Sequence, residues 1–433
     1  MTNDRRLGVY YALLVTQVVS LIGSQVSEYA VSIAIFRATG HATPLVLVAF
    51  FSSAPGIILG GFAGALADRF DRRWMMLIAN VGYTITSGLL LLSFASGAFQ
   101  LWHLYTIAFA ASVFATLERP AFQASVATLA PDSHRDRANA LAQLTYPASG
   151  AIAPALAGLL YVAIGVAGSI AVDVATFVVA IAVLAVVRIP RPAETAEGRA
   201  MRASVWRQAF DGFRYLAARP VLFGFCGYVS AVNLVASLAF VLLTPYALAR
   251  TGSAQLLGLV LAAMNVGGIA GSLTIGARGQ FRSRLGVVIA AIFAAGACLS
   301  LAGAAQSAPT LAASLFLLMF ALAFTNAPFW SFMQAKIAPD LQGRVFAAYL
   351  QLITLLTPLA FLVAGPLADR VFEPARRTPA WSSVGWLVGA GPGAGMGMIL
   401  VLSGVVLVAL TLAVVAIPSV RRLETDLPDH AAA

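Results

Sequence analysis

The sequence predicts an all-α membrane protein of about twelve spans, arranged as two six-helix halves in parallel repeat. Three observations predict this fold class: the composition, the long apolar segments and the distribution of basic residues. Of the 433 residues, 60% are hydrophobic and 10% are charged, whereas soluble domains are about one quarter charged. A membrane-spanning helix needs about 20 apolar residues. The short alternating segments of a membrane β-barrel are not seen.

Twelve apolar segments are long enough to span a membrane as helices, which satisfy their own backbone in lipid. The first is longer than the apolar part of a signal peptide and no small-residue cleavage site accompanies it, so we expect it to be retained. In chain order the predicted spans are 9–36, 44–67, 74–96, 101–127, 138–164, 169–187, 220–248, 254–276, 285–305, 309–334, 343–368 and 396–418.

The formal net charge of +10 follows the predicted topology. With a cytoplasmic N-terminus, one basic residue falls within span four and twenty-one of the 27 fall on the inner side. This asymmetry obeys the positive-inside rule and places both termini in the cytoplasm. We therefore expect a multi-pass protein of a bacterial cell inner membrane, with no nucleic-acid partner. The outer loops receive the remaining five: Arg37, Arg250, Arg370, Arg376 and Arg377.

Residues 188–219 contain no span and divide the chain into two halves. Trp206, Phe210, Phe213 and Ala217 recur there at helical spacing, which predicts a short amphipathic helix on the inner membrane surface. A simple tether is the alternative for residues 190–203. The predicted domains are a first half (1–187), a linker (188–219), a second half (220–418) and a cytoplasmic tail (419–433).

The two halves also match each other at a nearly constant offset. The segment Gly60–Leu66 corresponds to Gly267–Leu273, 207 residues later, and Pro120 corresponds to Pro328, 208 residues later. The Ala-Pro-Asp sequence that starts at Ala130 returns 208 residues later. Matches in one register indicate an internal duplication with both halves in the same orientation, as in transporters built from parallel repeats.

The loop after span two reads Gly-Ala-Leu-Ala-Asp-Arg-Phe-Asp-Arg-Arg from Gly64 to Arg73. It resembles the signature loop of the major facilitator superfamily. That resemblance implies a conformational brace between the inner faces of the two halves; the alternative is a solvated basic loop. The second-half copy lacks the aspartate, so we expect the brace to be asymmetric. The brace residues are Gly64, Asp68, Arg69, Arg72 and Arg73.

Longer stretches resemble the proton-coupled drug-efflux subfamily that includes macrolide efflux proteins and the enterobactin exporter. They are Asn326–Pro328, Pro339–Phe346, Gly365–Pro374 and Asp211–Leu216. The resemblance implies a secondary transporter that exports a drug, an antibiotic or a siderophore-like molecule in exchange for protons. An importer of the same fold is the alternative. Span five is similar in part to an antiporter motif through Gly150, Pro154 and Gly158, where small residues permit close packing and a bend.

Ionisable residues inside spans are costly and are functional candidates by default. Glu28 ends a polar stripe on span one that includes Thr16, Ser20 and Ser24. We expect Glu28 to carry the coupling proton or to contact a cationic part of the cargo, with a structural hydrogen bond as the alternative. The other proton-coupling or cargo candidates are Glu118, Arg119 and Asp173, for which structural roles stay open.

Neutral polar residues in the second half are candidates for the lining of a cargo cavity: Asn233, Asn265 and Asn326. Two isolated cysteines and four scattered histidines make a metal site or a membrane-embedded enzyme improbable. The sequence has no phosphate-binding loop of the ATPase type, which argues against ATP hydrolysis. A non-transporting receptor would predict a sizeable soluble domain, and the sequence shows none. We expect no cofactor and a monomer whose partners are a small-molecule cargo, protons and the lipid bilayer.

Overall fold

A computed structural model of the chain describes residues 3–69, 71–129, 135–187, 213–278, 281, 283–337 and 339–418. Within these ranges the protein is helical and has no strand. Ten helices there are long and apolar enough to cross a membrane. One of them holds two spans, and a shorter apolar helix, Thr43–Leu59, corresponds to the predicted second span. The all-helical fold with about twelve spans is therefore confirmed.

The chain forms two compact units. The first comprises Met1–Ala193 with Thr251–Ala262, and the second comprises Glu194–Arg250 with Ala263–Ala433. The predicted domain limits stay a prediction, because most of the linker lies outside the described residues. The described part of the predicted amphipathic helix, Phe213 to Ala217, is helical, and Leu216 within it is fully buried. Trp206 and Phe210 lie outside the described residues.

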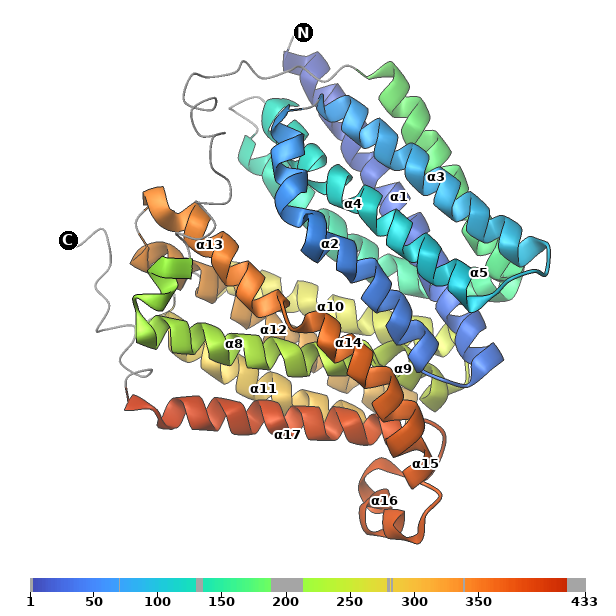
Figure 1. Cartoon of the computed structure of the whole chain (residues 1–433), viewed down its shortest axis with the longest axis vertical. Coiled ribbons are helices and arrows are strands. Elements are labelled where there is room, and N and C mark those ends of the chain that lie inside the picture. Colours follow the sequence, from blue (N-terminus) through green and yellow to red (C-terminus); the bar gives the residue numbers. More distant parts are fainter. Residues whose placement is uncertain are drawn as a thin grey trace. The chain divides into compact units, whose positions relative to one another are not determined.

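The first unit is a bundle in which α1 packs along α5, and α3 packs against both α4 and α5 (Figure 1). The helix α5 contains two spans, because Gly165 (φ 70°) interrupts its helical backbone. A positive φ is readily adopted by glycine, so Gly165 marks the turn between spans five and six. The helices of this unit are α1 (Asn3–Thr39), α2 (Thr43–Arg69), α3 (Arg72–Ala95), α4 (Leu101–Leu129) and α5 (Arg135–Val186).

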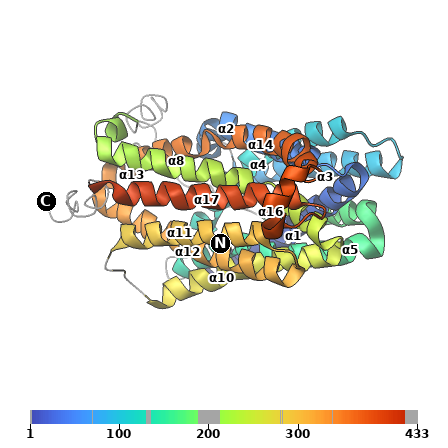
Figure 2. The same cartoon turned by 90° about the horizontal axis from the view of Figure 1, so that it is seen from below.

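The second unit packs α8 against α13, α14 and α17, while α11 lies between α12 and α17 (Figure 2). A small outer structure precedes α17 and contains α15 (Glu373–Ala375), η3 (Pro379–Trp381) and α16 (Ser382–Val388). The other helices are α8 (Pro220–Phe240), α9 (Leu243–Thr251), α10 (Ala254–Arg278), α11 (Arg284–Ala304), α12 (Ala308–Lys336), α13 (Pro339–Thr354), α14 (Thr357–Pro366), η2 (Leu367–Phe372) and α17 (Ala394–Ala416). The first residues of α10, up to Ala262, belong to the first unit.

Two spans predicted as continuous helices are interrupted. Span seven breaks between α8 and α9, four residues before Pro245, and span eleven breaks between α13 and α14, just before Pro358. Proline has no backbone N–H, so the carbonyl four residues earlier loses its helical partner. Pro55, Pro120 and Pro328 also lie inside helices without breaking them, which is why the sequence does not show which prolines interrupt a span.

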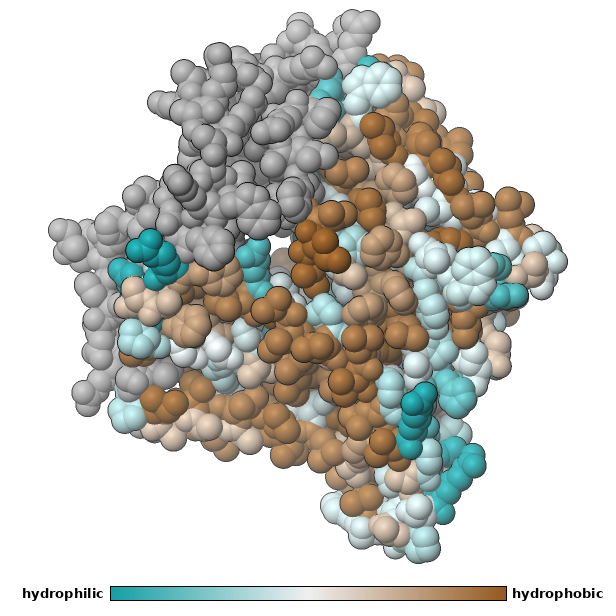
Figure 3. Space-filling view, in the orientation of Figure 1, coloured by the Kyte–Doolittle hydropathy of each residue, from teal (hydrophilic) through white to brown (hydrophobic). Residues whose placement is uncertain are grey.

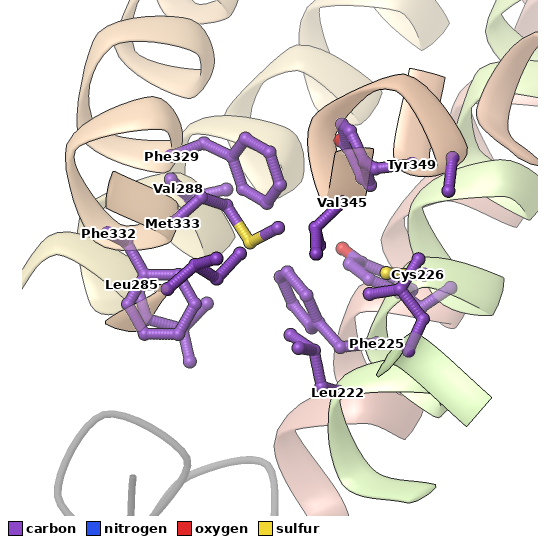
Figure 4. Packing of buried hydrophobic residues seen from close by; sticks show 14 of the residues in the cluster. Leu222, Phe225, Cys226, Leu285, Val288, Phe329, Phe332, Met333, Val345 and Tyr349 are labelled. Atoms are coloured by element: carbon purple, nitrogen blue, oxygen red, sulfur yellow. The ribbon is translucent and has the colours of Figure 1, made fainter. Parts of the chain in front are cut away.

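Large apolar side chains fill one end of the second unit. Phe225 of α8 points between Met333 of α12 and Val345 of α13, and its ring stacks on Phe329 at a centroid distance of 6.2 Å (Figure 4). Inside a membrane this packing is favoured by van der Waals contact, because lipid tails are as apolar as these side chains. The space-filling view shows apolar side chains over much of the described surface (Figure 3), as expected for residues that face lipid.

Glycines form the contact between α11 and α17 in this unit, and we call this contact the glycine seam. A Cβ atom added at Gly404 would lie 2.4 Å from the carbonyl oxygen of Gly296, and one added at Gly303 would lie 2.4 Å from that of Gly397. The two pairs are seven residues apart on both helices, so they repeat on one face. Small residues of this kind let membrane helices approach closely.

Candidate functional site

Two buried carboxyl groups lie inside the first unit. Glu118 is on α4 and Asp173 is on the second span of α5, and their exposed fractions are 9% and 3%. No buried Asp or Glu occurs among the described residues of the second unit. Both residues were predicted from the sequence as proton-coupling or cargo candidates, and the structure places them on the interior of one helical bundle.

Asp173 is held by one hydroxyl group from each of two neighbouring helices. Ser24 of α1 donates to Oδ1 at 3.0 Å, and Ser87 of α3 donates to Oδ2 at 2.9 Å. Gly23 allows this approach, because a Cβ atom there would lie 2.6 Å from Oγ1 of Thr176. Asp173 therefore ties α1 and α3 to the second span of α5.

Glu118 is held by neutral groups from the same two helices. Asn80 of α3 donates through Nδ2 to Oε1 at 3.3 Å, and the side chains of Tyr83 and Gln17 also interact with this carboxyl group. No cation pairs with Glu118 or Asp173 among the residues that the structure describes. Neutral hydroxyl and amide groups are thus the observed partners of both acids.

Tyr83 connects the surroundings of the two acids. Its side chain interacts with the carboxyl group of Glu118 and lies close enough to Asp173 to interact with it electrostatically. Its ring stacks on Phe177 at a centroid distance of 5.0 Å, which fixes its orientation. Asn80, Tyr83 and Ser87 are spaced three and four residues apart, so they occupy one face of α3. We call the set formed by Gln17, Ser24, Asn80, Tyr83, Ser87, Glu118 and Asp173 the polar row.

Sequence reasoning missed four members of the polar row: Gln17, Asn80, Tyr83 and Ser87. The signal that could have found three of them is their recurrence on one face of the otherwise apolar helix α3. Gln17 lies seven residues before Ser24, which is again helical spacing. Predicted candidates were chosen by their ionisable groups, and the neutral partners of those groups were therefore overlooked.

The other predicted residues of the first half take separate positions. Glu28 is exposed, and its carboxyl group has no hydrogen-bond or ion-pair partner among the described residues. Ser20 is buried, with 6% exposed. Arg119 is exposed and lies over the ring of Tyr146 at 5.4 Å, and no ion pair joins it to its neighbour Glu118 among the described residues.

The predicted brace is described in part. Gly64, Asp68 and Arg69 lie at the end of α2, where the side chains are outside the described part. Arg73 donates to the carbonyl oxygens of Leu184 at 2.7 Å and Ala185 at 2.5 Å. A cation stabilises the C-terminal end of a helix, so Arg73 secures the end of α5 within the first unit. Arg72 also has an interaction partner.

The predicted packing residues of span five lie on α5. A Cβ atom at Gly158 would be 2.6 Å from the carbonyl oxygen of Ala254, and one at Gly258 would be 2.3 Å from that of Pro154. These contacts lie within the first unit, which includes the start of α10. Gly150 is buried. The close approach at Pro154 and Gly158 is the kind of contact that small residues permit.

The three asparagines predicted for a cavity differ in their surroundings. Asn233 of α8 donates to the carbonyl oxygen of Ile353 at 2.6 Å and to Thr357 at 3.1 Å, across the break in span eleven. Ser230 donates to the carbonyl oxygen of Leu352 at 3.0 Å. These bonds satisfy carbonyl groups that the break leaves unpaired. Asn265 is half-buried with a partner, and Asn326 is exposed without one among the described residues.

Comparison with known proteins matches residues 13–359 to the Major Facilitator Superfamily. The chain is 25% identical to macrolide efflux protein A of Streptococcus pyogenes over 84% of its length and 90% of that protein. It is 23% identical to the multidrug efflux pump Tap of Mycolicibacterium fortuitum, over 85% of this chain and 91% of that protein. It is 28% identical to the enterobactin exporter EntS of Salmonella typhi, over 51% of each chain.

Solved structures share the fold at low identity. A bacterial homologue of the lysosomal transporter Spinster has a TM-score of 0.68 at 15% identity, covering 99% of this chain and 98% of that one. A mutant of the nucleoside transporter NupG has a TM-score of 0.72 at 12% identity, covering 94% and 99%. The family match and the shared helical fold lead to one conclusion: the chain belongs to the Major Facilitator Superfamily.

Proposed function

We propose that the protein exports a small molecule across the bacterial inner membrane in exchange for protons, by alternating access of its two halves. The observation that carries the proposal is the polar row, which holds two buried carboxyl groups among neutral partners. Intramembrane acids mark ion pathways and proton relays in transporters.

The neutral partners suit groups that gain and lose a proton. A hydroxyl group donates to a carboxylate and accepts from a carboxylic acid, and a side-chain amide also has both capacities. Ser24, Ser87 and Asn80 can therefore stay hydrogen-bonded in either state of the acids. An arginine or lysine partner would stabilise the ionised state alone. We assign proton exchange to Glu118 and Asp173 on this basis.

Glu28 is the acid suited to meet cargo or solvent. It lies on the face of α1 that carries Gln17 and Ser24, because the three residues are spaced by seven and four positions. The residue is exposed, and its carboxyl group has no hydrogen-bond or ion-pair partner among the described residues. We propose that Glu28 contacts a cationic part of the cargo or passes protons to the polar row.

The direction of transport is proposed from the relatives, three of which are named as efflux proteins or exporters. Import is the second candidate, because nucleoside and peptide transporters have the same fold. Fold likeness at 12% identity shows the architecture, and the cargo depends on the site. The proposed cargo class is a drug, an antibiotic or a siderophore-like molecule.

The test is a transport assay in inverted membrane vesicles with a panel of macrolides, other antibiotics and siderophores. We expect uptake of at least one compound that requires an imposed proton gradient. Glu118→Gln and Asp173→Asn should abolish the gradient dependence, whereas Glu28→Gln should change the apparent affinity for the cargo or slow proton entry. Glu373→Gln is the matched control, since Glu373 lies in the small outer structure and pairs with Arg376 at 3.1 Å.

Three results would contradict the proposal. Uptake that ignores the proton gradient in the unmodified protein would remove proton exchange. Gradient-driven uptake that persists unchanged in Glu118→Gln and Asp173→Asn would remove the polar row as its site. Cargo movement in the opposite direction would favour the importer. Equal amounts of folded protein in the membrane, measured by detergent gel filtration, are required for each comparison.

A further inference from the structure

An apolar groove lies on the second unit, between the first turns of α8 and the last turn of α17. Its volume is about 290 Å³. The lining residues are Pro220, Val221, Gly224, Phe225, Tyr228, Val414 and Ile417. Neither the proton chemistry of the first unit nor the predicted cargo residues involve this groove.

The lining offers no free polar group to a ligand. The hydroxyl group of Tyr228 is the one side-chain polar atom among the lining residues, and it is hydrogen-bonded to Oγ1 of Thr411 at 3.0 Å. The volume is at or below the lower end of the 300–1,000 Å³ range that drug-sized ligands occupy. The groove therefore suits an unbranched apolar chain better than a whole drug molecule.

The groove begins at the end of a predicted span and runs into it. Pro220 is the first residue of α8, and Tyr228 lies eight residues further on. Eight residues of α-helix rise about 12 Å, which is close to half of the roughly 30 Å hydrocarbon thickness. The groove thus extends from one membrane surface towards the bilayer centre, as an acyl chain of one leaflet does.

A positive charge stands at the membrane-surface end of the groove. Arg219 directly precedes Pro220, and its guanidinium group stacks on the ring of Tyr215 at 3.7 Å and donates to the carbonyl oxygen of Tyr215 at 3.3 Å. It has no carboxylate partner among the described residues. Arg219 is also the N-cap of α8, and no side-chain bond caps that helix. The start of a helix and a guanidinium group both attract phosphate.

We propose that this groove binds one anionic phospholipid, with an acyl chain in the groove and its phosphate at Arg219. The apolar lining, the length along α8 and the uncompensated charge at one end match the two parts of such a lipid. The site would couple the end of α8 to the composition of that leaflet. Since α8 also supplies Asn233 and Ser230 to the break in span eleven, lipid binding would stabilise the helix that holds this break.

The sequence offers a matched pair of variants for the test. Gly224 lines the groove, and a Cβ atom there would meet nothing within 4 Å, so Gly224→Leu fills the groove without a clash. Gly227 on the same helix also has nothing within 4 Å, but it does not line the groove. Glycine is about 0.8–1.0 kcal/mol less favourable in a helix than alanine, and leucine ranks just below alanine, so both variants should fold. Gly224→Ala is the smaller replacement.

The experiment counts lipids that stay bound to the purified protein by native mass spectrometry, after exchange into detergent with added phosphatidylglycerol or phosphatidylethanolamine of the same chain length. We expect the unmodified protein to retain one phosphatidylglycerol in preference to phosphatidylethanolamine. Gly224→Leu should reduce that retention at least tenfold, Gly224→Ala should reduce it less, and Gly227→Leu should leave it unchanged. Arg219→Gln should remove the preference for the anionic lipid, whereas Arg214→Gln, an exposed arginine five residues earlier, should preserve it.

Several outcomes would overturn the proposal. Equal retention of the two lipids by the unmodified protein would remove the role of charge. Equal losses in Gly224→Leu and Gly227→Leu would place the lipid elsewhere, and equal losses in Arg219→Gln and Arg214→Gln would indicate a diffuse surface attraction. Competition by inorganic phosphate alone would indicate an anion site without a chain. Binding that appears after residues 419–433 are deleted would mean that the protein's own tail fills the groove.

Discussion

The two units of the protein are both helical bundles, but their interiors bury different polar groups. The first unit buries two carboxyl groups, Glu118 and Asp173, with hydroxyl and amide partners from α1 and α3. The described interior of the second unit buries Ser and Thr but no acid. Its polar side chains instead satisfy its own backbone, as Asn233 and Ser230 do at the break in span eleven.

The two units therefore bury different kinds of polar groups. Buried acids are costly and are retained where their ionisation is used, so the first unit is the proposed place of proton exchange. The second unit relies on close helix packing along the glycine seam and on an apolar cluster around Phe225. Polar side chains that donate to the carbonyl groups at a helix break stabilise it and allow non-helical backbone inside the membrane.

The largest effect should come from the glycine seam of the second unit. Gly404→Leu adds a side chain where a Cβ atom would already lie 2.4 Å from the carbonyl oxygen of Gly296. Overpacking of this kind typically costs about 1–3 kcal/mol and sometimes more, so we expect loss of folded protein or a strongly lowered melting temperature in detergent. Gly276→Leu is the control, because its Cβ atom meets nothing within 4 Å. Equal melting temperatures for the two variants would show that the seam is not close-packed.

The second-largest effect is expected on proton-driven transport, when a hydroxyl group is removed from the polar row of the first unit. Tyr83→Phe removes the hydroxyl group that interacts with Glu118 and keeps the ring stacked on Phe177. A hydrogen bond to a charged group contributes about 1.5–3 kcal/mol, so proton-driven transport should fall roughly tenfold or more. The measurement is the initial rate of gradient-driven uptake in inverted vesicles.

Tyr349→Phe supplies the matched control for this prediction. Tyr349 lies in the apolar cluster of the second unit, where its ring stacks on Phe329 at a centroid distance of 4.8 Å. Its replacement should leave the gradient-driven rate close to that of the unmodified protein. A rate that falls equally in both variants would mean that tyrosine hydroxyl groups contribute alike in the two units.

A smaller effect on stability is expected at the break in span eleven. Asn233→Ala leaves the carbonyl oxygen of Ile353 without its 2.6 Å partner. An unsatisfied buried polar group costs about 1–3 kcal/mol, so the variant should unfold at a lower temperature. Asn326→Ala should be neutral, since Asn326 is exposed and has no partner among the described residues. A neutral result for Asn233→Ala would show that water replaces its bond.

The smallest effect should be the loss of one hydroxyl group at Asp173. Ser24→Ala and Ser87→Ala each remove one donor, at about 0.5–1.5 kcal/mol, and the double variant should change gradient-driven transport by more than the sum of the single changes. Coupling beyond additivity is expected for residues that share a partner. Ser314→Ala is the control, because Ser314 donates to its own helix at Thr310. Strict additivity would argue against a shared role.

Sequence reasoning predicted most where one physical requirement dominates, namely the need of each membrane span for a long apolar helix. The spans follow from apolar length, and Gly165, where the backbone leaves the helix, lies between predicted spans five and six; the break before Pro358 was not predicted. It reached Asp173 and Glu118 because an acid in an apolar segment is conspicuous. It missed Asn80, Tyr83 and Ser87, because a neutral polar residue in a span gives no sign of whether it faces lipid, a helix or another polar group.

What the sequence by itself determined is the membrane fold: the cost of unsatisfied backbone groups in lipid leaves helices as the solution for its long apolar segments. Its motifs and its internal repeat also indicated the family. The tertiary structure alone decided the partners. Helix packing brought Ser24 and Ser87 onto Asp173, set Arg119 over the ring of Tyr146, and placed Asn233 on the break in span eleven. Such contacts join residues up to about 150 positions apart, and no local pattern encodes which helix faces lie together.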